Sequence, residues 1–212
     1  MEAPLALESS RPMLADMGVA LTDAQWSQWC ALPDALAEWN AQINVVSRKD
    51  VEHAVEHHLL HSACLVPFLG PLDGKRVVDI GTGGGFPGLP LAILYPNTHW
   101  TLVDSIGKKI KVVQALSDAL GLVNVEAIHA RVEQAPGPFH TAVTRAVAPM
   151  PQLLEWMRTQ WASGPDRRLL ALKGGDLTDE LRGIRNCTVH PLAHRVPREF
   201  FSTKAVVEVR VR

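Results

Sequence analysis

Several features that define common protein classes are scarce or missing in this chain of 212 residues. Cysteine occurs only three times, at Cys30, Cys64 and Cys187, and no CxxC pair is present. This excludes a disulfide framework and a zinc–cysteine site. No apolar run reaches about 18 residues, and the early residues carry acids without an apolar segment, so neither a membrane span nor a secretory signal is predicted. We therefore expect a cytoplasmic protein.

Charge of one sign is not in excess either, because the formal net charge is −1. A balance so close to zero excludes a protein held on nucleic acid by bulk charge alone. The distribution is uneven, since residues 1–144 carry 9 basic and 15 acidic side chains, whereas residues 145–212 carry 12 basic and 7 acidic. This asymmetry permits a polyanionic partner on the C-terminal side, and solvated surface charge is the equal alternative.

Apolar residues are abundant, at 47% of the chain, which is enough for a folded core. A change of pattern places a boundary between an N-terminal helical extension, residues 1–69, and a core, residues 70–212. In the core, strands alternate with helices, which predicts an α/β fold with a mostly parallel sheet covered on both faces. No helix separates the last two strands, so we expect them to be antiparallel. The strands are predicted over residues 76–80, 100–104, 124–129, 141–145, 168–173, 187–190 and 205–211, and the helices over 89–94, 108–120, 150–161 and 176–184.

The N-terminal extension is predicted to contain two main helices. Thr22 and Gln25 have the spacing of a capping box, in which each side chain bonds to a backbone N–H group of the first turn. An apolar series with helical spacing follows, and Pro33 interrupts it. The second helix is predicted over residues 50–66.

The most specific segment runs from residue 77 to residue 88, where a short apolar strand ends in an acid before a run of glycines. Gly81, Gly83 and Gly85 permit positive φ angles and allow a ligand to approach the backbone closely. A tight turn between a strand and a helix needs only one or two glycines. The pattern therefore indicates a ligand-binding loop.

Two cofactors have to be weighed for this loop. A GxGxxG frame that ends at Gly88 is a weak signal for a dinucleotide. Asp79, before the first glycine, favours S-adenosylmethionine (SAM), because a carboxylate can orient its amino group but is unfavourable beside a pyrophosphate. Asp104 ends the next strand, where a carboxylate can accept hydrogen bonds from both ribose hydroxyls. Asp104 does not separate the two cofactors, since both contain that ribose.

A competing pattern lies in the second predicted helix, where His53, Glu56 and His57 form an HxxEH sequence. Two histidines four residues apart share one helix face and can bind zinc, with Glu56 as general base and Glu133 as a third ligand. This zinc-hydrolase alternative leaves the glycine loop unexplained.

Seven short motifs occur in order along the chain: WNAQINVVSRKD from Trp39, then HHLLHS, GTGGGFPGLPLAIL, LVDSIGKK, ARVE, TRAVAP and ALKGG. Together they resemble the bacterial small-subunit ribosomal RNA guanine-N7 methyltransferase family RsmG, also called GidB. Two positions depart from the family pattern, because His57 stands where an arginine is usual and His61 where an aspartate is usual. Histidines that titrate near neutral pH would make this face of the protein pH-sensitive.

The resemblance implies a Rossmann-like, class I SAM-dependent methyltransferase with a seven-stranded, mostly parallel sheet and an N-terminal helical extension. It implies SAM as the methyl donor and N7 of a guanosine in the 530 loop of 16S rRNA as the acceptor. The partner is then 16S rRNA, either free or within a small-subunit ribonucleoprotein; we expect a monomer with neither a metal nor a membrane contact. The residues at the family's cofactor positions are Gly81, Phe86, Asp104, Val132, Glu133 and Arg145.

Methyl transfer to guanine N7 needs no general base, because this nitrogen has an available lone pair and bears no proton. No catalytic residue is therefore assigned. Arg145 and Lys173 each end a predicted strand and are candidates for positioning the reactants, with purely structural roles as the alternative. Arg145 suits the methionine carboxylate or the target base, and Lys173 suits a phosphate.

Basic residues also occur at two places that suit RNA, the second of them mixed with the aromatic residues Phe200 and Phe201. Solvated surface charge is the alternative for the first place, and a start of the last strand for the phenylalanines. A methyltransferase-fold RNA-binding module without catalysis is a further alternative, against which the intact glycine loop argues. The RNA-binding candidates are Lys108, Lys109, Arg195 and Arg198.

Overall fold

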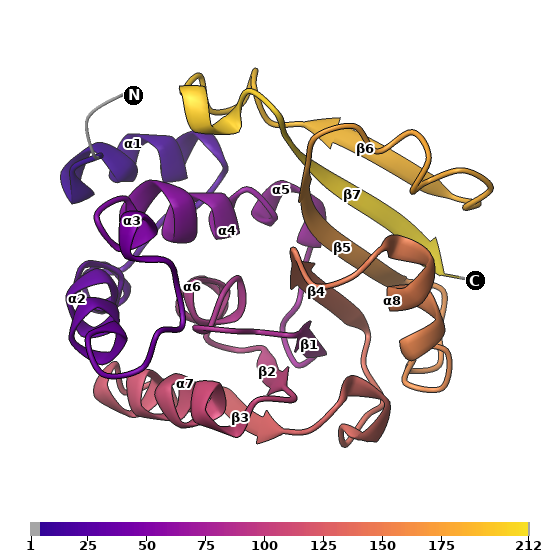
Figure 1. Ribbon diagram of the computed structural model, residues 1–212, viewed down its shortest axis with the longest axis horizontal. Helices are drawn as coiled ribbons and strands as arrows, with labels where there is room; N and C mark the ends of the chain where they lie inside the picture. The colour runs from indigo at the N-terminus through magenta and orange to yellow at the C-terminus, as the bar shows by residue number, and fades with distance from the viewer. Residues whose placement is uncertain (1–4, 212) are drawn as a thin grey trace.

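A computed structural model describes residues 5–211, and of Arg48 only the main chain. Its centre is a seven-stranded sheet in the order β3-β2-β1-β4-β5-β7-β6 (Figure 1). The pairs from β3 to β5 are parallel, and β7 is antiparallel to both β5 and β6. The predicted mostly parallel sheet and the predicted antiparallel pair of the last two strands are confirmed. Each strand lies within one residue of its predicted bounds. The strands are β1 Arg76–Ile80, β2 His99–Asp104, β3 Val125–His129, β4 Thr141–Arg145, β5 Arg167–Gly174, β6 Cys187–Pro191 and β7 Lys204–Val211.

Helices cover both faces of this sheet, which confirms the predicted Rossmann-like α/β class. The N-terminal helices lie on one side with α6 and α7, and α8 lies on the other (Figure 1). None of the described helices is both long and apolar enough to cross a membrane. The helices are α1 Leu7–Asp16, α2 Asp23–Asn40, α3 Arg48–Val51, the π-helical η1 Val55–Leu60, α4 His61–Ala63, α5 Val66–Leu69, α6 Gly88–Leu94, α7 Gly107–Ala119 and α8 Met150–Trp156, with 3-10 turns η2 Val132–Gln134 and η3 Glu199–Phe201.

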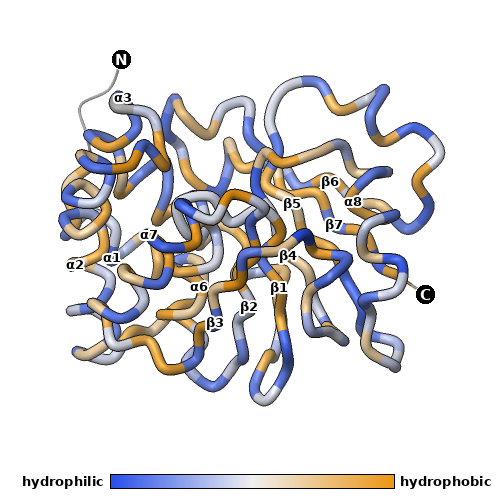
Figure 2. Tube along the Cα trace, turned by 60° about the horizontal axis from the view of Figure 1, so that its bottom comes forward, coloured by the Kyte–Doolittle hydropathy of each residue, from blue (hydrophilic) through white to orange (hydrophobic). Residues whose placement is uncertain are grey.

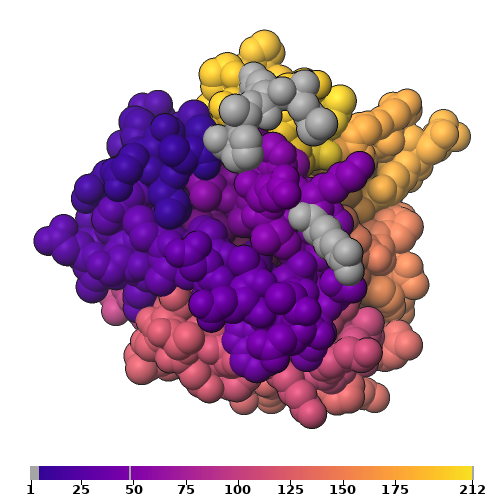
Figure 3. Space-filling view, turned by 60° about the vertical axis from the view of Figure 1, so that its left-hand side comes forward, coloured from indigo at the N-terminus to yellow at the C-terminus, as the bar shows by residue number. Residues whose placement is uncertain are grey.

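The central strands are apolar on both faces because both are covered. Along β1, Val77 belongs to the core on the side of the N-terminal helices, whereas its neighbour Val78 belongs to the core under α8. Hydrophobic stretches accordingly run through the central strands, and hydrophilic stretches lie in outer loops (Figure 2). Trp29 of α2 is fully buried in the same cluster as Val77. Figure 3 shows that the N-terminal residues form most of the surface on this side.

Helix α2 begins as predicted but is longer than its sequence suggested. The capping box of Thr22 and Gln25 is present, with both reciprocal hydrogen bonds. The predicted interruption at Pro33 is wrong, because α2 continues through it to Asn40. Proline removes only one helical hydrogen bond, and buried residues on both sides of it, such as Leu32 and Leu36, hold the helix against the core.

The single helix predicted over residues 50–66 is also wrong, because the chain forms α3, η1, α4 and α5 there instead. A π-helical turn contains an additional residue per turn, and such turns occur often at functional sites. Pro67 stands in the first turn of α5 and cannot donate a hydrogen bond to the preceding turn, so the helix starts anew there.

Two helices after β4 differ from their predicted extent. The helix predicted over residues 150–161 ends at Trp156, because Trp161 is drawn into an isolated β-bridge with Phe139. The helix predicted over residues 176–184 is a series of turns. Gly175 precedes this segment and Gly183 lies within it, and both have φ angles of +80°, a conformation outside the α-helix.

Candidate active site

A cavity of about 400 Å³ lies at the carboxyl ends of β1, β2 and β4. Parallel sheets bind ligands at this edge, where the strand order reverses, and β1 and β4 flank that point here. The volume falls within the range of small-molecule sites. Seven of the nine predicted cofactor residues line the cavity, namely Gly81, Gly83, Phe86, Asp104, Val132, Glu133 and Arg145.

The glycine loop has a shape that only glycine tolerates at two cavity-lining positions. Gly81 has a φ of +65°, and a Cβ atom there would lie 2.5 Å from Cγ2 of Val147. Gly83 has a φ of +60°, and its Cβ would meet no side chain within 4 Å. The space beside Gly83 therefore belongs to the cavity, so a ligand can approach the main chain there. Gly85 does not line the cavity, and a Cβ at this position would collide with Leu89.

Asp79 lies behind the loop and does not line the cavity. One carboxylate oxygen, Oδ2, accepts a hydrogen bond of 2.9 Å from the N–H group of Gly88 at the start of α6. Complete burial raises the pKa of Asp79 to about 7. Sequence reasoning assigned this carboxylate to the ligand directly, whereas the structure places it where it joins β1 to α6.

Asp104 links the glycine loop to the end of β2. Its Oδ2 accepts a hydrogen bond from Gly83 N at 3.0 Å, and its Oδ1 accepts one from Ile106 N at 2.9 Å. Each carboxylate oxygen keeps a second lone pair, so Asp104 can still accept hydrogen bonds from a ribose that enters the cavity. The same contacts fix the loop relative to the sheet.

Arg145 is held at the end of β4 by the N-terminal helices. Its Nη1 donates hydrogen bonds of 2.8 Å to the main-chain oxygen of His57 and to Nδ1 of His58. Because arginine only donates, Nδ1 of His58 must be the accepting nitrogen, and the imidazole is neutral. Burial lowers the pKa of Arg145 to about 10, against the attraction of Asp79, so the guanidinium stays charged at neutral pH. Its guanidinium carbon lies 5.3 Å from the ring centre of Phe86.

His58 is a site residue that sequence reasoning missed. Its ring stacks on Phe86 at 4.7 Å, so it contacts both the glycine loop and Arg145. The only sequence signal was its place in the HHLLHS motif. The π-helical turn η1 supplies both acceptors of Arg145, and its presence could not be read from the periodicity.

The histidine departures behave differently from the hypothesis of two groups that titrate near neutral pH. The Nδ1 atom of His57 lies 2.8 Å from Oδ1 of Asp50. His61 is buried against Phe200 and Phe201, and burial followed by the nearby charge of Arg145 holds its pKa well below the usual value. The hypothesis is therefore wrong for His61, which remains neutral in the folded protein.

This burial predicts that acid destabilises the protein. In the unfolded chain His61 takes up a proton below about pH 6.5, whereas the buried side chain in the folded protein resists protonation. The contribution of His61 to the free energy of unfolding is therefore complete above that pH and is lost as the pH falls. Each such histidine contributes up to about 1.4 kcal/mol per pH unit. Between pH 7 and pH 5, the free energy of unfolding of the wild type should fall by about 1–2 kcal/mol more than that of His61→Gln. Urea titrations at the two pH values measure this difference. The exposed His194 provides the matched control, because His194→Gln should follow the wild type. Equal losses in both variants would contradict this.

The remaining positioning and RNA-binding candidates are dispersed. Lys173 does not reach the first cavity; its Nζ donates to the Ala148 carbonyl at 2.6 Å and pairs with Glu180 at 2.8 Å. Lys109 lines the cavity and Lys108 is exposed beside it. The other two basic candidates lie elsewhere: Arg195 over the ring of Phe68, and Arg198 in an ion pair with buried Glu56.

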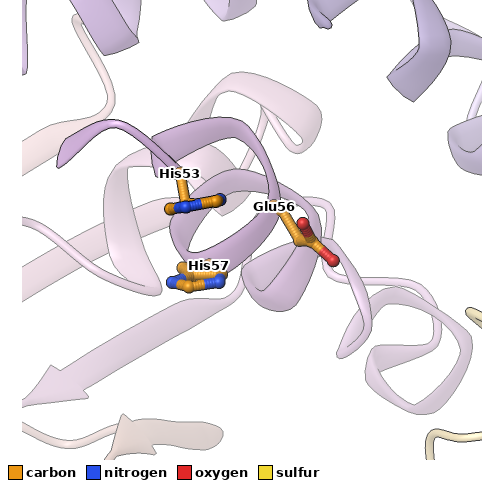
Figure 4. Close-up of side chains that lie close together, drawn as sticks. All are labelled: His53, Glu56 and His57. Carbon is orange, nitrogen blue, oxygen red and sulfur yellow. The ribbon is translucent and has the colours of Figure 1, made fainter. Parts of the chain in front are cut away.

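The residues of the zinc alternative do gather in space. Ligand atoms of His53, Glu56 and His57 lie within 4.8 Å of one another. The two imidazole rings are stacked, however, at 4.8 Å and 13°, and the carboxylate of Glu56 points away from them (Figure 4). Both oxygens of Glu56 accept hydrogen bonds from Arg198, at 2.7 and 3.0 Å. Glu133, the third ligand of this alternative, lines the glycine-loop cavity instead. Stacked rings and an engaged carboxylate do not fit a tetrahedral zinc site.

The pair of Glu56 and Arg198 joins η1 to the segment before η3, and it predicts a stability effect. The side chains are only 4% and 17% exposed, so Glu56→Gln should lower the free energy of unfolding by about 3 kcal/mol. The exposed pair of Glu155 and Arg158 is the control, and Glu155→Gln should cost less than about 1 kcal/mol. Urea denaturation measures both. Similar losses in the two variants would show that the ion pair is not structural.

The strand order and the cavity at the switch point of the sheet define the chain as a Rossmann-like α/β protein with a ligand site. A solved SAM-dependent methyltransferase from Aquifex aeolicus has the same fold, with a TM-score of 0.56 and 18% identity over 85% of this chain and 98% of that one. The family model for GidB, "rRNA small subunit methyltransferase G", matches residues 25–200.

Curated relatives agree with this family. The "Ribosomal RNA small subunit methyltransferase G" of Parabacteroides distasonis is 47% identical over 89% of this chain and 84% of its own length. The protein of the same name from Christiangramia forsetii is 45% identical over 89% of this chain and 91% of its own. The chain therefore belongs to the rRNA small subunit methyltransferase G family, which confirms the resemblance seen in its motifs.

Proposed function

We propose that this protein transfers a methyl group from SAM to N7 of a guanosine in the 530 loop of 16S rRNA. The observation that carries this proposal is the cavity at the switch point of the sheet, in which Gly83, Asp104 and Arg145 meet. Membership of the methyltransferase family supports it.

The residues of the cavity fit SAM. Open space beside Gly83 admits the ligand to the main chain, and Asp104 offers lone pairs to the ribose. Val132 and Glu133 of η2 also line the cavity and would lie beside the adenine ring of SAM. The cation of Arg145 suits the methionine carboxylate. Bound SAM would supply an electrophilic methyl group on a sulfonium.

The protein's contribution to the reaction is positional. Guanine N7 uses its own lone pair to form the new N–C bond while the S–C bond breaks, so the products are 7-methylguanosine and S-adenosylhomocysteine. No side chain has to remove a proton. The loop and Arg145 would hold the donor so that the acceptor can approach in line, and such positioning can supply about 7–11 kcal/mol of the barrier.

The N-terminal helices form part of this machinery. We propose that residues 1–69 are an extension packed on the core of residues 70–212, because they share its hydrophobic cluster and hold Arg145. Lys108, Lys109 and Arg195 are proposed to contact the rRNA backbone. The proposal places the enzyme in the cytoplasm as a monomer.

The test compares 16S rRNA from a wild-type strain with that from a strain that lacks this protein. We expect 7-methylguanosine in the 530 loop to disappear from the deletion strain and to return when the wild-type gene is restored. Unchanged methylation would refute the proposed function. Restoration by a variant that no longer binds SAM would favour the alternative of an RNA-binding module without catalysis.

A further inference from the structure

A second cavity of about 370 Å³ adjoins the first. Arg145 and Ala146 line both, so the two cavities meet at the end of β4. A methyl group passes in line from donor to acceptor, and the two reactants must therefore occupy neighbouring spaces. If the first cavity holds the donor, the second is the space next to it in which an acceptor can lie.

The walls of this second cavity suit a flat, polar ring. His57 of η1 and Phe200 of η3 both line the cavity, and their rings stack on one another at 4.0 Å and 15°, so an aromatic pair forms part of the wall. Lys204 lies at the same cavity, with its Nζ 5.0 Å from the ring centre of Phe200. Aromatic surface and cations together are typical of sites for unpaired nucleobases.

Asp50 supplies the one acidic side chain among the described residues that line this cavity. Its Oδ1 lies 2.8 Å from Nδ1 of His57, and its Oδ2 accepts a hydrogen bond of 2.6 Å from Ser47. Partial burial opposes ionisation, but these hydrogen bonds outweigh it and lower the pKa of Asp50. A carboxylate offers about four lone-pair sites, so two remain for another pair of donors.

The charges at the cavity match guanine better than the other bases. Guanine presents two adjacent donors, N1–H and the N2 amino group, and carries the acceptors O6 and N7 on the opposite edge. A carboxylate can accept from both donors, whereas the lone pair on N1 of adenine would repel it. With N1 and N2 toward Asp50, the N7 edge turns toward Arg145 and the donor cavity. Lys173 lines this cavity as well, but its ammonium group is already paired with Glu180.

We propose that the second cavity is the acceptor-base pocket and that Asp50 selects guanine by accepting hydrogen bonds from N1–H and the N2 amino group. This rests on the proposed function. Cations at the cavity, Arg145 and Lys204, are the donors available to O6, which leaves N7 free for the methyl group.

The test measures methyl transfer by the full chain from radiolabelled SAM to two RNAs, an unmodified 16S rRNA transcript and small subunits from cells that lack this protein. Asp50→Asn should reduce kcat/KM for the RNA roughly 10- to 100-fold, while the Kd for SAM, measured by calorimetry, stays within about twofold. The neighbouring exposed acid Glu52 provides the control, because Glu52→Gln removes the same charge outside this cavity and should leave kcat/KM unchanged.

A second substrate tests selectivity itself. In a transcript with adenosine at the methylated position, Asp50→Asn should narrow the preference for guanosine, because an amide can also donate to N1 of adenine. Equal kcat/KM and equal selectivity in Asp50→Asn and Glu52→Gln would overturn the inference and leave the function intact, as would a parallel loss of SAM binding in Asp50→Asn. A wild-type protein that forms no 7-methylguanosine in either RNA would refute the proposed function itself.

Discussion

Arg145→Ala is expected to reduce methyl transfer at least about 100-fold and to weaken SAM binding. The guanidinium lines both cavities and lies over the ring of Phe86, so its loss removes the cation at which the two cavities meet. It also leaves the His57 carbonyl and Nδ1 of His58 without their donor, which should lower the free energy of unfolding by about 1–3 kcal/mol. Steady-state kinetics, calorimetry and urea denaturation measure the three effects.

Two further variants separate charge from geometry. Arg145→Lys keeps the charge but lacks the planar guanidinium that bonds both acceptors, so it should recover little of the activity. Arg182, whose side chain is 77% exposed, is the control, and Arg182→Ala should match the wild type. An Arg145→Ala protein with more than half of the wild-type activity would show that this cation positions neither reactant.

Gly83→Asp should weaken SAM binding at least about 100-fold, because the side chain would fill the space that the loop leaves open to the ligand. The backbone cost is separate. A residue other than glycine at a φ of +60° lowers the free energy of unfolding by about 1–2 kcal/mol. Calorimetry with SAM measures the first effect, and urea denaturation measures the second.

Gly121 offers a closely matched control. It has a φ of +65°, and a Cβ there would also meet nothing within 4 Å, but it follows α7 away from the cavity. Gly121→Asp should therefore show a similar loss of stability with unchanged SAM binding. If both variants lost SAM affinity equally, the effect of Gly83→Asp would be one of folding and the assignment of this loop would be wrong.

The centre of the sheet could be predicted from the sequence because its central strands are buried on both faces. Short apolar runs such as residues 76–80 are bounded by polar and turn residues, and this pattern does not depend on distant contacts. The second predicted helix failed for the opposite reason. The π-helical turn of η1 brings the His57 carbonyl to Arg145, 88 residues away, and local periodicity contains no information about such a partner.

The site was predictable where one local segment forms it. The glycines and Asp104 were found because strand ends and positive φ angles impose strict residue types. The position of Asp79 behind the loop was not foreseen, since a strand-end acid can turn toward the ligand or toward the next helix. The second cavity was predicted only in part. Arg145 and Lys173 were positioning candidates, but Asp50 was not, because these residues meet only in the folded chain.

The contact of Arg145 with η1 also sets the timing of assembly during synthesis. The acceptors at residues 57 and 58 leave the ribosome long before Arg145, which follows 88 residues after His57. At a synthesis rate of about 5–20 residues per second, roughly 4–18 seconds pass between the synthesis of η1 and that of Arg145. Slow codons between these positions would prolong the interval in which the histidine-rich turn is exposed to chaperones and proteases.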